Sequence, residues 1–190
     1  MRDVWNSWKR PTAAVVFAAV LGAVAATAQE GPPRPEPTKE HRWLDNLVGE
    51  WSVEGEAHLE PGKPPVKFAG TERVRRVGGF WTTSDYSGEF LGEAFTGVFT
   101  IGYDPAQSSF VATWIDSNQS HLWQYKGSLD AAGRTLTLEG EGPCCVEQGK
   151  TVKVRDTMEI RGKDHRIFTV KIQKDGSWVT AMTLHYRRKA

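Results

Sequence analysis

From Trp51 onward, apolar and polar residues alternate with a period of two, and residues typical of turns interrupt this alternation at short intervals. A period of two indicates strands, because successive side chains point to opposite faces of a sheet. The connections are too short for crossover helices, so neighbouring strands should pair antiparallel. The expected strands span residues 51–59, 66–77, 80–90, 94–103, 110–116, 121–129, 135–139, 151–161, 165–173 and 178–188.

An open meander of about ten strands would leave two unpaired edges, and closing the sheet on itself removes both. We therefore predict an all-β, antiparallel up-and-down barrel of about ten strands, of the lipocalin or calycin kind. A two-sheet sandwich is the alternative, although no connection marks a strand that changes sheets. Residues 38–48 should form a short N-terminal helix that caps the barrel, since Thr38 can cap its start and Gly49 can end it.

The first 37 residues differ from the rest of the chain. In residues 1–28, basic residues precede an Ala- and Val-rich run that ends in Ala26-Thr27-Ala28, as in a secretory signal peptide. The run is shorter than the roughly 20 apolar residues of a membrane-spanning helix, so a retained anchor is the less favoured alternative. We expect cleavage after Ala28 and a periplasmic or secreted protein with no stable membrane anchor. Residues 29–37 read as a proline-rich linker, and residues 38–190 as a single barrel domain.

Charge and motifs exclude several classes of function. The chain has 24 Lys and Arg against 23 Asp and Glu, and cleavage after Ala28 would remove 3 basic and 1 acidic residues, leaving 21 and 22. Binding to nucleic acid would need a basic excess, so we expect no nucleic-acid partner. No phosphate-binding loop, nucleophile elbow or His-Glu-x-x-His stretch appears in the sequence. The oligomeric state stays open.

Several short segments, taken together and in order, resemble a bacterial family. They lie at residues 44–51, 78–80, 87–90, 102–104, 113–117 and 149–155. The family they resemble is the domain of unknown function DUF1579, and the resemblance covers nearly everything after the linker. It implies a calycin-like barrel, and the family has no agreed activity to carry over.

A looser similarity is to the nitrobindin-type haem barrels, which carry Gly-x-Trp near the first strand and a haem-ligating His near the carboxyl end. Gly49-Glu50-Trp51 and His185 stand in comparable places. His185, however, alternates with the apolar residues Leu184 and Tyr186. If the apolar face points into the barrel, His185 points to solvent, so we expect no haem or other cofactor.

Residues 151–161 show the clearest two-faced pattern. Asp156 lies on the apolar face of this segment together with Met158. Burial raises the pKa of a carboxyl there or demands a partner such as an Arg or Tyr from another strand, and Tyr186 is a candidate companion. A paired core charge, or an acid near the barrel mouth, is the simpler interpretation, and contact of Asp156, Met158 and Tyr186 with a ligand is the alternative.

Trp114 and Asp116 share one face of the strand expected at residues 110–116. Trp114 is a candidate for the wall of a pocket and Asp116 for its mouth, and neither forms a catalytic signature. Cys144 and Cys145 are adjacent, so a disulfide between them would be strained. In an oxidising compartment we favour this vicinal disulfide over free thiols or an intermolecular bond, and we expect no metal site, because two neighbouring ligands do not make one.

These observations support three hypotheses in order of preference. The first is an exported protein that binds a small apolar or amphipathic ligand in a barrel cavity lined by aromatic residues. The second is a structural or interaction scaffold whose barrel is filled by its own side chains. The third is an enzyme that uses Asp156.

Overall fold

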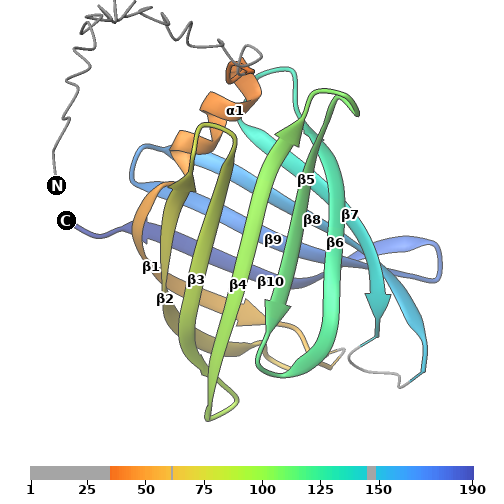
Figure 1. The fold of residues 1–190 in the computed structure, drawn as a ribbon. Coiled ribbons are helices and arrows are strands. Elements are labelled where there is room, and N and C mark those ends of the chain that lie inside the picture. The colour runs from red at the N-terminus through yellow and green to blue at the C-terminus, as the bar shows by residue number, and fades with distance from the viewer. Residues whose placement is uncertain (1–34, 61, 145–148) are drawn as a thin grey trace, which may run out of the picture. The chain divides into compact units, whose positions relative to one another are not determined.

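The computed structural model describes residues 35–60, 62–144 and 149–190 (Figure 1). The predicted signal peptide and residues 29–34 of the predicted linker lie outside the described residues. A short helix, α1 (Lys39–Trp43), and a 3-10 turn, η1 (Leu44–Asn46), come before the strands. The strands are β1 (Gly49–Ala57), β2 (Val66–Val77), β3 (Trp81–Phe90), β4 (Glu93–Asp104), β5 (Ser109–Asp116), β6 (Gln119–Leu129), β7 (Thr135–Pro143), β8 (Thr151–Gly162), β9 (His165–Lys174) and β10 (Ser177–Arg188).

The strands form one closed barrel in which each strand pairs antiparallel with its neighbours in the sequence. The first and last strands also pair with each other, from Trp51 opposite Arg188 to Ala57 opposite Met182. Figure 1 shows this closure between β1 and β10. The prediction of an all-β, up-and-down antiparallel barrel with ten strands is confirmed for the described part of the chain.

Most predicted strand bounds differ from the structure by up to two residues, and two predicted elements differ by more. The strand expected at residues 135–139 continues to Pro143, because Gly140 and Gly142 keep the ladder with β8 and do not form a loop. The helix expected at residues 38–48 ends at Trp43 and continues only as the 3-10 turn η1. This tighter turn closes with a hydrogen bond from the Leu47 N–H to the Leu44 carbonyl oxygen, at 3.0 Å.

The segment formed by α1 and η1 lies across one end of the barrel (Figure 1). The Trp43 indole N–H donates to the Gly133 carbonyl oxygen at 2.8 Å, in the turn between β6 and β7. His41 Nε2 lies 3.0 Å from the carbonyl oxygen of Tyr103, at the end of β4. These bonds fix the predicted capping helix to the strand ends.

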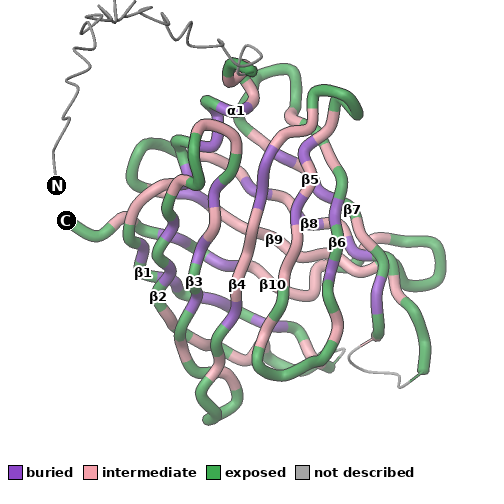
Figure 2. Tube along the Cα trace, viewed as in Figure 1, coloured by how far each residue is buried: buried purple, intermediate pink, exposed green. Residues whose placement is uncertain are grey.

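The core follows from the alternation of inward and outward side chains along the strands, which is clearest in β1. In β1 every second residue from Trp51 to Ala57 is buried and the residues between them are exposed, which Figure 2 shows as alternating purple and green. The buried apolar side chains of the strands pack against Leu44 and Leu47 from the capping segment. The capping segment and the strands therefore share one apolar core, which closes the barrel end near α1.

Leu44→Ala tests this closure. Leu44 has no exposed surface, so its truncation should lower the free energy of unfolding by about 2–5 kcal/mol. Val77→Ala is the control, because Val77 is 45% exposed and should change stability by less than about 0.5 kcal/mol. Urea unfolding followed by tryptophan fluorescence measures both, and equal effects would mean that the capping segment is not part of the core.

Candidate ligand-binding site in the barrel

The inside of the barrel divides into two halves. Toward α1, large inward side chains such as Trp51, Ile101, Phe110 and Leu136 are at most 1% exposed. Away from α1, the inward positions carry glycines on several strands, and we call this part the glycine half. Its inward glycines are Gly55 in β1, Gly70 in β2, Gly88 in β3, Gly97 in β4 and Gly142 in β7.

Aromatic rings from neighbouring strands lie over these glycines. A Cβ atom on Gly55 would overlap the Phe68 ring, and one on Gly97 would overlap the Trp114 ring. Gly142 has the same relation to Trp123. Each ring therefore occupies the space that a side chain on the adjacent strand would take, and lies along the wall of the barrel.

The inward aromatic side chains of the glycine half keep part of their surface accessible. Phe68, Phe95, Phe99 and Trp114 point into the barrel, yet each is only partly buried. Side chains that point into a filled barrel would be fully buried. Solvent therefore reaches part of each of these rings.

A charged pair occupies the middle of the barrel. The Arg166 guanidinium in β9 pairs with the Glu72 carboxylate in β2, and the Ser84 hydroxyl donates to the same carboxylate at 2.8 Å. The guanidinium also lies 4.7 Å from the Trp51 ring centroid and 4.3 Å from that of Tyr186. The positive charge of Arg166 is thus already matched within the protein.

Asp156 in β8 is the second inward acid, and its surroundings differ. It is 5% exposed, and its Oδ1 atom has no hydrogen-bond partner among the described residues. Burial raises the pKa of Asp156 to about 7, and a hydrogen bond from the Tyr125 hydroxyl opposes this shift only in part. Burial and the nearby Asp156 charge also raise the pKa of Tyr125. Asp156 is therefore a desolvated acid that accepts a hydrogen bond from a neutral phenol, that of Tyr125.

Trp114 and Asp116 lie at the barrel end opposite α1. The Trp114 indole N–H donates to Asp116 Oδ2 at 2.9 Å, and the Asn118 N–H donates to Asp116 Oδ1 at 2.8 Å. The Phe95 ring stacks on Trp114 with centroids 6.3 Å apart. Asp116 therefore holds both the turn after β5 and the orientation of the Trp114 ring.

The structure brings together only part of the residue set predicted from the sequence. Met158 and Tyr186 point inward, but they pack against Arg166 and are buried. The companion of Asp156 is Tyr125, not Tyr186 as expected. The sequence interpretation missed the ion pair of Glu72 and Arg166. The signal was present, because both lie in phase with apolar residues on their strands, as Asp156 does.

Other sequence predictions concern residues away from the barrel interior. His185 lies exposed on the outer face, beside His165. Cys145 lies outside the described residues, so the predicted disulfide between Cys144 and Cys145 stays a prediction. Within residues 35–60, 62–144 and 149–190, no group of three or more His, Cys, Asp or Glu side chains could hold a metal ion. No helix in this part of the chain is long and apolar enough to span a membrane.

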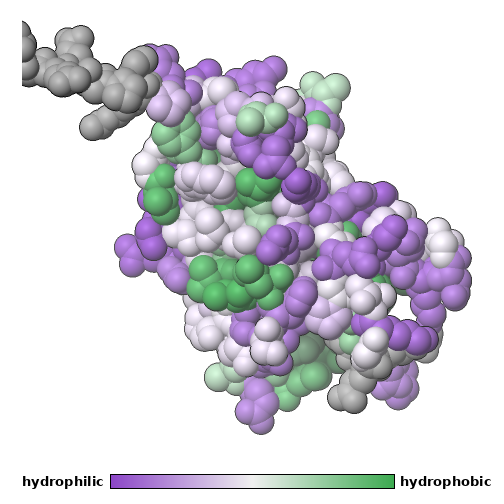
Figure 3. Space-filling model, turned by 45° about the vertical axis from the view of Figure 1, so that its right-hand side comes forward, coloured by the Kyte–Doolittle hydropathy of each residue, from purple (hydrophilic) through white to green (hydrophobic). Residues whose placement is uncertain are grey.

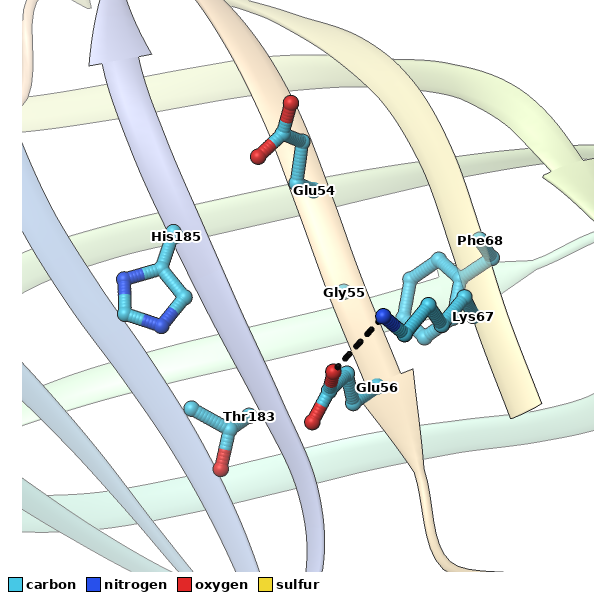
Figure 4. Close-up of a pocket in the computed structure, with 7 residues that line it drawn as sticks. All are labelled: Glu54, Gly55, Glu56, Lys67, Phe68, Thr183 and His185. Atoms are coloured by element: carbon cyan, nitrogen blue, oxygen red, sulfur yellow. Dashed lines mark ion pairs between the residues drawn. The ribbon is translucent and has the colours of Figure 1, made fainter. Parts of the chain in front are cut away.

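The outer face carries a shallow groove of about 400 Å³ over β10, β1 and β2 (Figure 4). Its rim is polar, with Glu54, His185 and an ion pair of 3.7 Å between Lys67 and Glu56. Lys67 is 81% exposed, so this pair contributes little energy. In the view of Figure 3 the outer face is largely polar, with apolar residues in small patches. Phe68 lines this groove as well as the glycine half. The inward aromatic side chains of the glycine half are more apolar than the groove rim, which favours the barrel interior as a ligand site.

The fold defines this chain as a closed, ten-stranded, up-and-down β-barrel with a capped end and a glycine-lined end. The family model described as "Protein of unknown function (DUF1579)" matches residues 36–188, so the chain belongs to this family, as the sequence predicted. No curated protein matches the chain.

Solved structures share the barrel at low sequence identity. The structure described as "Crystal Structure of Rv2717c from M. tuberculosis" has a TM-score of 0.57 and 10% identity, and the match covers 82% of this chain and 100% of that chain. A second, "Structure of a redesigned beta barrel, b11L5F_LGL", has a TM-score of 0.43 and 11% identity, with 82% of this chain and 100% of that chain covered. The first similarity supports the fold alone.

Asp156→Asn should stabilise the protein at neutral pH. The folded-state pKa of Asp156 is about 7, whereas an unfolded Asp titrates near 4, so the folded wild type binds the extra proton between these values. The stability that protonation of Asp156 gives to the folded wild type is fully present below about pH 4 and is lost as the pH rises through about 7. Asn mimics the protonated side chain at every pH.

The difference in unfolding free energy between Asp156→Asn and the wild type should therefore grow by up to about 4 kcal/mol between about pH 4 and pH 8. Urea unfolding at several pH values measures it. Because all other carboxyls are common to both proteins, a difference that stays constant over this range would contradict the shifted titration of Asp156.

Glu72→Gln should be strongly destabilising, by about 3–5 kcal/mol, because it leaves the buried Arg166 charge without its partner. Glu50→Gln is the matched control. Its ion pair with Arg73 is exposed, so the loss should be less than about 1 kcal/mol. Chemical denaturation compares the two variants, and similar losses would mean that the central pair is hydrated.

Proposed function

We propose that this protein binds a small apolar or amphipathic molecule in the glycine half of its barrel, with the polar part of the molecule directed toward Asp156. The observation that carries this proposal is the partial exposure of inward aromatic rings, among them Phe68 and Trp114. These rings face the lumen and still expose apolar surface to water. An apolar ligand would cover that surface, which is favourable.

The dimensions of the barrel support this function. About eight strands give an interior that side chains can just fill, and this barrel has ten. Rings that lie over Gly55 and Gly97 lie against the wall of the barrel. The predicted signal peptide fits an exported binding protein.

The polar groups support an amphipathic ligand rather than a purely apolar one. Most inward side chains of the glycine half are apolar. Asp156, which lies between Leu138 and Val170 in the strand register, has a buried Oδ1 without a hydrogen-bond partner among the described residues. A buried polar atom without a partner has a cost of about 1–3 kcal/mol, which a hydrogen bond from a ligand would remove. Apolar walls with a few placed polar groups are typical of small-molecule sites.

Filling the lumen should abolish binding. Val170 points inward beside Asp156 in the register of β8 and β9, and Val170→Trp would place an indole in the glycine half. We expect the neutral apolar dye N-phenyl-1-naphthylamine to bind the wild type in a saturable manner, with an affinity at least about tenfold lower in Val170→Trp. Dye fluorescence measures both.

Leu122→Trp is the matched control, because Leu122 lies on the outer face and is 48% exposed. It should bind the dye as the wild type does. A wild type that does not bind, or equal binding by all three proteins, would contradict a lumen site and favour a scaffold whose barrel is filled.

A further inference from the structure

The charges that face the lumen are unbalanced toward the acidic side. Glu72 and Arg166 neutralise each other, which leaves Asp156 without a basic partner among the described residues. Asp116, at the mouth, adds a second carboxylate and is bonded by groups of its own turn and by Trp114. A ligand that enters the glycine half therefore meets acidic groups at the mouth and at depth.

We propose that the ligand of the glycine half is a cationic amphiphile, whose protonated amine pairs with Asp156 through Oδ1 while its apolar part lies against the aromatic wall. This inference rests on the proposed function and specifies the chemical class of its ligand. The pairing needs no rearrangement of the central ion pair, since Glu72 already binds Arg166.

A cation fits this site better than an anion for two physical reasons. An anionic ligand would approach Asp116 and Asp156 and would have to compete with Glu72 for Arg166. A cation gains a charge-assisted hydrogen bond to Asp156 Oδ1 in a site of low dielectric. The rings of Trp114 and Tyr125 can add cation–π attraction along the path.

The protonation of Asp156 links amine binding to pH. The groups that face Asp156 are Tyr125 of β6 and, at longer range, Tyr186 of β10, which senses Glu72, Arg166 and Asp156. Burial raises the pKa of both tyrosines, so both stay neutral near pH 7. Only the deprotonated carboxylate of Asp156 pairs with an ammonium group, so amine affinity should rise with pH across the acidic range.

A matched series of ligands tests the proposal on the full mature protein. Octylamine, octanol and octanoate share one apolar chain and differ in their head groups, and each is titrated against bound N-phenyl-1-naphthylamine. We expect octylamine to displace the dye at a concentration at least about tenfold lower than octanol, with octanoate the weakest. The octylamine affinity should also fall as the pH is lowered from about 8 to about 5.

Asp156→Asn should remove both the preference for octylamine and its pH dependence, and should leave octanol binding in place. Glu54→Gln is the control, because it removes one negative charge from the exposed outer face and should keep the octylamine preference. If a variant folds poorly, the comparison of octylamine, octanol and octanoate on the wild-type protein still tests the preference for a cation.

The outcomes separate the two proposals. Dye binding with equal affinity for octylamine and octanol, or stronger binding of octanoate, would overturn the cationic class and leave the binding function standing. An octylamine preference that survives in Asp156→Asn would overturn the role of Asp156. Absence of dye binding in the wild type would instead contradict the proposed function itself.

Discussion

The pairing of β1 with β10 is the constraint on which the rest of this structure depends. Seven residue pairs, from Trp51 opposite Arg188 to Ala57 opposite Met182, join the two ends of the strand series. Closure leaves no sheet edge and places every second side chain of every strand in one shared interior. Which atoms fill that interior then determines both the stability and the chemistry of the protein.

The two halves of the interior are packed differently: the half near α1 forms the apolar core, and the glycine half is packed less completely. Near α1, Trp51, Phe110 and Leu136 are almost completely buried and supply the apolar core. In the glycine half, residues such as Gly55 and Gly97 weaken the strands, since glycine adds no packing and has a high entropic cost on folding. The rings that lie over these glycines recover part of the packing, which fits the proposed ligand site beside a stable core.

Local sequence patterns predicted the strands well and the site less well. The bounds of β2, Val66–Val77, were predicted correctly, because turn residues flank a long alternating run. The end of β7 was not predicted, because glycines such as Gly142 are typical of loops. In the structure Gly142 lies in the strand, and the Trp123 ring occupies the space beside it. The contact of Tyr125 with Asp156 joins strands that are not adjacent, so it depends on register and barrel tilt, which local periodicity does not encode.

The proposed ligand site joins the aromatic wall of the glycine half to Asp156 as its polar anchor. A crystal structure of the protein grown with a bromine-labelled alkylamine tests it most directly, because the anomalous signal locates the far end of the ligand. We expect bromine between the rings of Trp114 and Phe68, and the ammonium nitrogen within hydrogen-bond distance of Asp156 Oδ1. Bromine only in the outer groove beside Glu54 and His185, with the lumen closed by side chains, would contradict it.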